Sequence, residues 1–271
     1  MDIYWTPYDI LFKNRNNSER KMGMIQLILG LVVGLGPSLA LYFWLRKRSM
    51  ETPAYPETCG KALTAGLLAT FPIVLLSGVL FLLLRVTGLQ KTHPLLYQVP
   101  YTFIVLAFSE ELIKYLSFRR LLKKMQQPYS WRELTVLMAV VAIGFGLAES
   151  LLYLVGSNVI VMLIRGIAIP HGGYGAIVGW FYGRSLKTGR RGDRVLGFVL
   201  AWLLHGLYDF SLAREFAAFN ENLAIAIALT ISVLNLALII ALILFVVRTR
   251  GNETYTAPLY SAADKESTDI F

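Results

Sequence analysis

Charged residues are scarce in this chain. They make up 16% of its 271 residues, whereas hydrophobic residues make up 56%. A soluble domain of this length needs a larger polar share to cover its surface, and a mean hydropathy of +0.56 is too high for one. The composition therefore excludes a soluble globular protein and indicates a protein that crosses a membrane several times.

Cysteine is nearly absent as well. The single cysteine, Cys59, cannot form a disulfide within the chain, and no cysteine or histidine lies at metal-ligand spacing from it. The net charge of +9 could indicate a nucleic-acid partner, but the basic residues form short clusters between apolar segments, as cytoplasmic loops of membrane proteins do. We therefore exclude a nucleic-acid partner and expect the bilayer as the main surroundings.

Seven apolar segments of about 20 residues are long enough to cross a bilayer as helices. They cover residues 23–45, 62–84, 97–117, 134–155, 159–183, 195–213 and 223–247. Lipid offers no hydrogen bonds to exposed backbone groups, so a helix is favoured for every span. We predict an all-α, multi-pass transmembrane helix bundle of about seven spans, forming a single domain over residues 23–249. Residues 1–22 are then an N-terminal extension, and residues 250–271 are a polar, mobile tail.

The distribution of lysine and arginine predicts the orientation. The loops after spans one, three and five and the C-terminal tail hold most of these residues, and basic loops stay on the cytoplasmic side. We therefore expect a cell-membrane protein with its N-terminus outside and its C-terminus in the cytoplasm. Four basic residues ahead of the first span oppose this orientation; they are Lys13, Arg15, Arg20 and Lys21.

Ionisable side chains lie inside four successive spans, although a charge at the bilayer centre costs about 3 kcal/mol or more. They are Glu110, Glu111 and Lys114 in span three, Glu149 in span four, Arg165 and His171 in span five, and His205 and Asp209 in span six. At about 1.5 Å of rise per residue, all except Lys114 and Arg165 fall near the expected midplane. We therefore predict one polar site between spans three to six.

The spacing of these residues indicates which of them form pairs within a helix. Lys114 follows Glu110 by four residues and Glu111 by three, so its ammonium can offset the burial of either carboxylate. Asp209 follows His205 by four residues, a separation at which a carboxylate orients an imidazole. A structural ion pair remains an alternative for the glutamates and Lys114, and His171 beside Pro170 could instead cap a helix break.

These side chains suit hydrolysis of a peptide bond by an activated water. A buried carboxylate beside a second one can take a proton from water, while a nearby histidine donates to a developing oxyanion. A serine nucleophile has less support, because Ser109 and Ser211 lie near the site without a G-x-S-x-G setting. We expect no cofactor, but histidine and glutamate are zinc ligands, so a metal stays open even though no H-E-x-x-H pair is present.

Four motifs on successive spans carry a resemblance to a known family. They are Glu110-Glu111-x-x-Lys114, Phe145-x-x-x-Glu149, His171 in a glycine-rich segment, and His205-x-x-x-Asp209. This ordered set, over about residues 97–213, resembles the PrsW-type intramembrane proteases. These belong to a superfamily with the CAAX prenyl endopeptidases, the Abi/CPBP proteases and the Aph subunit of γ-secretase. The CAAX branch typically has EExxxR, FxxxH and HxxxN, so Lys114, Glu149 and Asp209 favour the PrsW branch.

The resemblance implies a function and roles for the residues. Characterised PrsW-type proteins are similar to glutamate-dependent proteases that make the first cut in a single-pass anti-sigma factor. Glu110 and Glu111 would then be the catalytic carboxylates and His205 the essential histidine. The supporting residues would be Glu149, His171 and Asp209, with Lys114 in an ion pair. The sequence leaves open which glutamate is the base and what the oligomeric state is. Two other functions also stay open: a non-catalytic scaffold like Aph, and a proton- or cation-coupled transporter. Transporters often have internal repeats, and we find none in this sequence.

Overall fold

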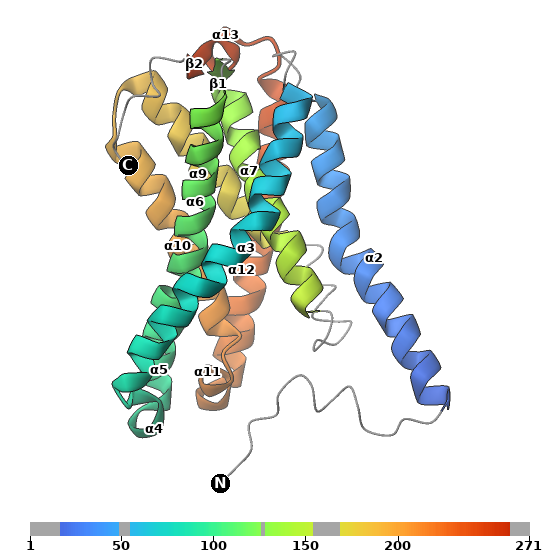
Figure 1. Cartoon of the computed structure of the whole chain (residues 1–271), viewed down its shortest axis with the longest axis vertical. Coiled ribbons are helices and arrows are strands. Elements are labelled where there is room, and N and C mark those ends of the chain that lie inside the picture. Colours follow the sequence, from blue (N-terminus) through green and yellow to red (C-terminus); the bar gives the residue numbers. More distant parts are fainter. Residues whose placement is uncertain (1–16, 49–54, 126–127, 154–168, 261–271) are drawn as a thin grey trace.

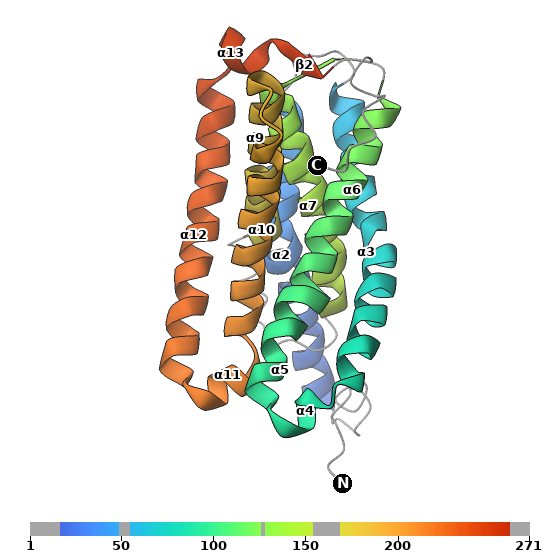
Figure 2. The same ribbon diagram turned by 90° about the vertical axis from the view of Figure 1, so that its left-hand side faces the viewer.

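The computed structural model describes residues 17–48, 55–125, 128–153 and 169–260. Long helices run between two ends of the molecule (Figure 1). A short helix and two short strands cover one end, and the short helices α4, α5 and α11 lie at the opposite end (Figures 1 and 2). The described part of the chain is thus a helix bundle, as predicted.

The long helices correspond to the seven expected spans. They are α2 (Asn17–Arg48), α3 (Tyr55–Val86), α6 (Ser109–Lys124), α7 (Trp131–Tyr153), α9 (Pro170–Thr188), α10 (Gly192–Ser211) and α12 (Glu221–Arg248). The short helices are α4 (Leu89–Thr92), α5 (Pro94–Pro100), α11 (Arg214–Phe219) and α13 (Glu253–Thr256). By length and composition, three of the described helices, α3, α7 and α12, can cross a membrane. The all-α membrane fold is confirmed, and the number of seven spans stays a prediction.

The third span contains a π-helical segment. This segment, η1 (Tyr101–Phe108), continues α5 and leads without a break into α6. A π-helical turn is wider than an α-helical one and occurs often at functional sites. Here it ends directly before Ser109, so the change of helical pitch comes just ahead of the two glutamates of α6.

The fifth span differs from its prediction. Ile169 has a left-handed backbone, with φ of 41°, and α9 begins at the next residue, Pro170. Proline has no backbone N–H to donate and a fixed φ, which suits the first position of a helix. The prediction of one helix over residues 159–183 is therefore wrong at residue 169, and α9 continues to Thr188. Residues 154–168, which include Arg165, lie outside the described part of the chain.

Helix α7 is the centre of the bundle and packs closely against α3 and α9. A Cβ atom added at Gly66 of α3 would lie 1.9 Å from the carbonyl oxygen of Val141, and one at Gly144 would lie 2.3 Å from that of Leu63. Gly175 brings α9 close to α7 as well, since a Cβ atom there would lie 2.8 Å from the carbonyl oxygen of Met138. Small residues let helix backbones approach in a membrane. These glycines therefore set how closely α3 and α9 approach α7.

We expect Gly66→Ala to lower the free energy of unfolding by about 3 kcal/mol, because the methyl group would collide with backbone that cannot rotate away. The measurement is unfolding in mixed detergent micelles. The matched control is Gly78→Ala on the same helix, where nothing lies within 4 Å of an added Cβ atom. Equal stability of the two variants would show that α3 and α7 pack less closely than described.

Side-chain caps and the C-terminal segment order the end of the bundle at α7. Ser130 and Glu133 form a capping box. The hydroxyl of Ser130 accepts a hydrogen bond from the backbone N–H of Glu133 at 3.2 Å. The carboxylate of Glu133 accepts one from the backbone N–H of Ser130 at 2.9 Å. Strands β1 (Tyr129–Ser130) and β2 (Pro258–Tyr260) pair in antiparallel fashion beside it.

The prediction of a mobile tail from residue 250 is wrong for residues 253–260. These residues form α13 and β2, and the ring of Tyr255 lies 4.8 Å from that of Trp131 and 5.3 Å from that of Phe245. Aromatic contacts of this kind hold the segment against α7 and α12. Residues 261–271 and residues 1–16 lie outside the described part of the chain, and α2 begins at Asn17, inside the expected N-terminal extension.

Candidate active site

The ionisable residues predicted to share one site form a single cluster between four helices. They are Glu110, Glu111 and Lys114 of α6, Glu149 of α7, His171 of α9, and His205 and Asp209 of α10. The side chains of Glu111 and Lys114 are fully buried, and those of His171 and His205 are nearly so. The predicted convergence of spans three to six is thus present in the structure.

Glu111 connects Lys114 of its own helix with His205 of α10. Its Oε1 atom lies 2.6 Å from Nζ of Lys114 and 2.9 Å from Nδ1 of His205. An ionised carboxylate only accepts hydrogen bonds, so both nitrogens donate to it. The other ring nitrogen of His205, Nε2, then faces the carboxylates of Glu110 at 3.6 Å and Asp209 at 3.4 Å. The shortest contact that orients His205 therefore comes from Glu111 of another helix, and not from the expected Asp209.

His171 links Lys114 to Glu149. Its Nδ1 atom lies 3.2 Å from Nζ of Lys114, and its Nε2 atom lies 2.6 Å from Oε2 of Glu149. An ammonium group has donors only, so Nδ1 accepts and the ring hydrogen is on Nε2, which donates to Glu149. Both ring nitrogens of His171 are therefore engaged by neighbouring side chains.

Glu110 differs from Glu111 in its contacts. Its Oε2 atom is buried and has no hydrogen-bond partner among the described residues, which is also true of Oε2 of Glu111, but Oε1 of Glu111 accepts two hydrogen bonds. The nearest charged groups are Nε2 of His205 at 3.6 Å and Nζ of Lys114 at 3.9 Å. Buried polar atoms are nearly always hydrogen-bonded to protein or water, so a carboxylate oxygen in this position is suited to receive a water or substrate group.

Aromatic rings surround the cluster. The Phe145 ring, part of the predicted motif, lies 4.7 Å from Nζ of Lys114 and meets the His171 ring edge-on at 5.0 Å. The Tyr174 ring stacks on His205, with centroids 5.2 Å apart and an interplanar angle of 22°. These contacts cover the charged groups and limit the rotation of both histidine rings.

Tyr174 and Asn235 are members of the site that the sequence analysis missed. The side-chain amide of Asn235 on α12 donates to the hydroxyl of Tyr174 at 3.0 Å, and Asn235 is fully buried. Two signals were present: Tyr174 follows His171 by three residues on the same helix, and Asn235 is a polar residue in the middle of the last apolar segment. The seventh span therefore contributes to the site through Tyr174.

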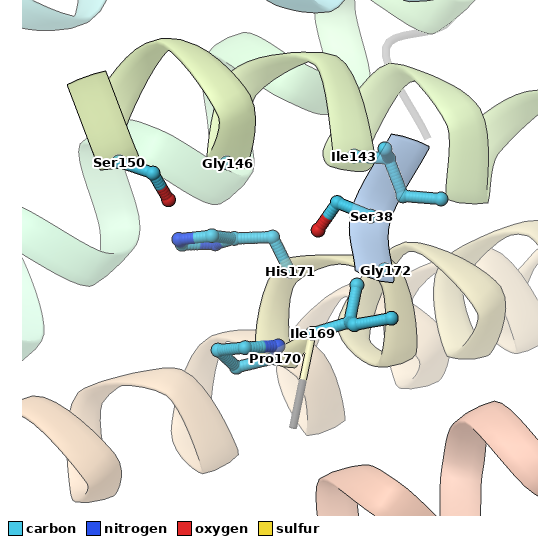
Figure 3. Close-up of a pocket in the computed structure, with 8 residues that line it drawn as sticks. All are labelled: Ser38, Ile143, Gly146, Ser150, Ile169, Pro170, His171 and Gly172. Carbon is cyan, nitrogen blue, oxygen red and sulfur yellow. The ribbon is translucent and has the colours of Figure 1, made fainter. Parts of the chain in front are cut away.

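A small pocket opens beside His171, between α2, α7 and the start of α9. Figure 3 shows the hydroxyl groups of Ser38 and Ser150 pointing toward His171 in this pocket. Gly146 makes room for the ring, since a Cβ atom there would lie 3.0 Å from Cδ2 of His171. The cavity volume of about 10 Å³ is at the lower limit of the space that one water molecule needs. The pocket therefore has room for at most one water molecule beside His171.

Among the described residues, three side chains of the cluster could together hold a metal ion. Donor atoms of Glu110, His171 and His205 all lie within 4.8 Å of one another. Two histidines and a glutamate are a ligand set of the kind found in catalytic zinc sites. The residue types therefore suit a metal ion. Whether their arrangement also suits one depends on the hydrogen bonds that the donor atoms already make.

Comparison with known proteins gives the family. The sequence model of a family described as PrsW family intramembrane metalloprotease matches residues 57–254, well over half of the chain. The chain belongs to the PrsW family. Protease PrsW of Oceanobacillus iheyensis is 27% identical to it over 123 residues, which are 44% of this chain and 56% of that relative's length. No solved structure matches the chain.

Membership of the PrsW family confirms the resemblance that the four motifs carried. The segment that matches the PrsW family begins in α3 and ends in α13, so it includes every residue of the buried cluster. It also includes Tyr174 and Asn235, which lie outside the motifs read from the sequence. Family membership together with the long apolar helices shows that this PrsW family member is a membrane protein.

Proposed function

We propose that this PrsW family member hydrolyses a peptide bond of a membrane-anchored protein, using a water molecule activated by Glu110. The observation that carries the proposal is the buried Oε2 atom of Glu110, which faces Nε2 of His205 at 3.6 Å without a hydrogen-bond partner among the described residues. A separation of this size between two polar atoms allows a water or a substrate oxygen to bridge them. The PrsW family match and the curated relative support a protease.

The contacts of the two glutamates suggest different roles. Glu111 is engaged through Oε1 with Lys114 and His205, so it positions those side chains, whereas Oε2 of Glu110 lies 3.6 Å from Nε2 of His205, the group proposed to donate to the oxyanion. In the proposed reaction, Glu110 takes a proton from water as the water oxygen attacks the peptide carbonyl carbon. The protonated form of His205 donates from Nε2 to the oxyanion. Glu110 then returns its proton to the leaving amine, and the C–N bond breaks.

The remaining polar residues support this pair. His171 has both ring nitrogens engaged with Lys114 and Glu149, so we assign it a positioning role. Asp209 lies 3.4 Å from Nε2 of His205 and places a second carboxylate beside that ring. Tyr174 stacks on the same ring and keeps its plane fixed.

The proposed substrate is a single-pass membrane protein of the anti-sigma-factor type, cut within the cell membrane. The proposed orientation keeps the N-terminus outside and the C-terminus in the cytoplasm. Several clusters of basic residues support it, because they lie at the bundle end that carries α13 and the strands (Figure 1). Clusters of this kind mark the cytoplasmic side of a membrane protein.

The test is cleavage of a tagged single-pass reporter by the purified full chain in lipid vesicles. We expect the wild type to produce two fragments and His205→Phe to be at least about 100-fold slower, because the oxyanion loses its donor. Phenylalanine keeps the ring that stacks on Tyr174, so the variant should stay folded. His93→Phe, in the connection between α4 and α5, is the matched control. Equal cleavage rates for His205→Phe and the wild type would refute the assignment of His205.

A further inference from the structure

Lys114 lies among the groups that could hold a metal ion. Its Nζ atom is 3.2 Å from Nδ1 of His171 and 3.9 Å from Oε2 of Glu110, and its side chain is fully buried. The description of the PrsW family names a metalloprotease. Whether Glu110, His171 and His205 of this chain fit a metal ion therefore depends on how they meet Lys114.

His171 has no lone pair to give to a metal in this arrangement. A histidine binds a metal ion through the lone pair of an unprotonated ring nitrogen. The lone pair of Nδ1 accepts a hydrogen bond from Lys114, and Nε2 carries the hydrogen that is donated to Glu149. One of the three candidate ligands is thus engaged on both sides by the side chains around it.

The charge of the site also argues against a bound metal ion. The ammonium of Lys114 is held by Glu111 at 2.6 Å and lies 4.7 Å from the centre of the Phe145 ring, which attracts a cation through its face. A divalent ion bound to Oε2 of Glu110 would lie close to this ammonium and be repelled by it, strongly so in a buried site. The ammonium offsets part of the carboxylate charge and would repel a second cation, so the residues present do not fit a metal ion as arranged.

We propose that Lys114 is the resident cation of this site, and that its ammonium takes the place that a divalent metal ion would have among Glu110, His171 and His205. Lys114 then has two effects. It neutralises charge beside the glutamate pair, and by donating to Nδ1 of His171 it removes a ligand that a metal would need. The proposal concerns the occupant of the site and is tested by metal binding, so its failure differs from failure of the proposed hydrolysis.

The experiment is a titration of the full chain, purified in detergent, with Co²⁺, whose visible absorption reports ligation by histidine. We expect wild-type protein to bind no stoichiometric Co²⁺. We expect Lys114→Met, which keeps the length of the side chain without its charge, to bind Co²⁺ at least about 100-fold more tightly. The double variant Lys114→Met/His171→Phe should lose the gained absorption, because the freed ligand is removed.

Two further variants make the result decisive. Lys61→Met is the matched control, because Lys61 is an exposed lysine of α3 that pairs with Glu57 at the surface, and it should behave as the wild type. Lys114→Gln, which retains a donor toward Glu111, is a second neutral variant in case Lys114→Met does not fold. Folded neutral variants that bind Co²⁺ no more tightly than the wild type would overturn the proposal.

The wild-type titration is decisive even if neither neutral variant folds. One Co²⁺ per wild-type chain, with absorption that disappears in His171→Phe, would show that a metal displaces Lys114 from His171 and would overturn the proposal. Wild-type protein without such binding supports it.

Discussion

Replacing Glu110 with glutamine should lower the rate of substrate cleavage about 1,000-fold, since a general base contributes roughly 100- to 10,000-fold to a proton transfer. Glutamine has the shape of glutamate, but its amide cannot accept the proton of the attacking water. The loss should fall on kcat with little change in KM, because Glu110 acts on the water and need not bind the substrate. Initial rates on a membrane-tethered reporter in vesicles measure both quantities.

The stability of Glu110→Gln separates loss of chemistry from loss of fold. Oε2 of Glu110 has no hydrogen-bond partner among the described residues. The free energy of unfolding of the variant should therefore lie within about 1 kcal/mol of that of the wild type. Glu57→Gln, on the exposed part of α3, is the control that changes a glutamate without touching the cluster. If Glu110→Gln stays active while Glu111→Gln is folded and inactive, the base is Glu111.

Replacing Glu111 with alanine should lower the free energy of unfolding by about 4 kcal/mol, because truncating one partner of a buried ion pair leaves the other charge unpaired. Two donors lose their acceptor at once, the ammonium of Lys114 at 2.6 Å and Nδ1 of His205 at 2.9 Å. Unfolding in mixed detergent micelles measures the effect. The same change at Glu57, whose ion pair is exposed to solvent, should have an effect below about 1 kcal/mol.

A double variant tests the reason for this loss. Glu111→Ala combined with Lys114→Met removes both charges of the pair, so it should recover part of the stability that Glu111→Ala alone has lost. A double variant that is less stable than Glu111→Ala would contradict this explanation and would mean that Lys114 is held mainly by His171 and the Phe145 ring. The two predictions thus distinguish the adjacent glutamates: replacing Glu110 should mainly lower the rate of cleavage, and replacing Glu111 should mainly lower the free energy of unfolding.

Pairs within one helix were predictable because they depend on spacing alone. Lys114 lies beneath Glu111 and within 4 Å of Glu110, as the separations of three and four residues indicate. The pair of His205 and Asp209 follows the same rule. The contact between Glu111 and His205 was not predictable, because it joins residues 94 apart in the sequence and depends on how α6 and α10 are rotated about their axes.

The start of α9 shows the limit of reasoning from apolar segments. Hydropathy continues through residue 169, and it carries no information on the left-handed backbone of Ile169 directly ahead of α9. Pro170 was the signal, and the length of the apolar run outweighed it. The consequence for function is direct, because a helix that begins at Pro170 places His171 in its first turn, where it reaches both Lys114 and Glu149.

The sequence by itself determined that this is an all-helical membrane protein with ionisable side chains on four of its long helices, because apolar length and the energetic penalty of intramembrane charge are local properties. Only the tertiary structure decided which carboxylate accepts hydrogen bonds from Lys114 and His205, which one faces Nε2 of His205, and that Tyr174 and Asn235 belong to the site. The physical reason is close packing at glycines such as Gly175, where α9 meets α7, and Gly206, where α10 meets Phe103 of η1, because such contacts set the distance and rotation between helices. Side chains of different helices meet, or fail to meet, according to that packing.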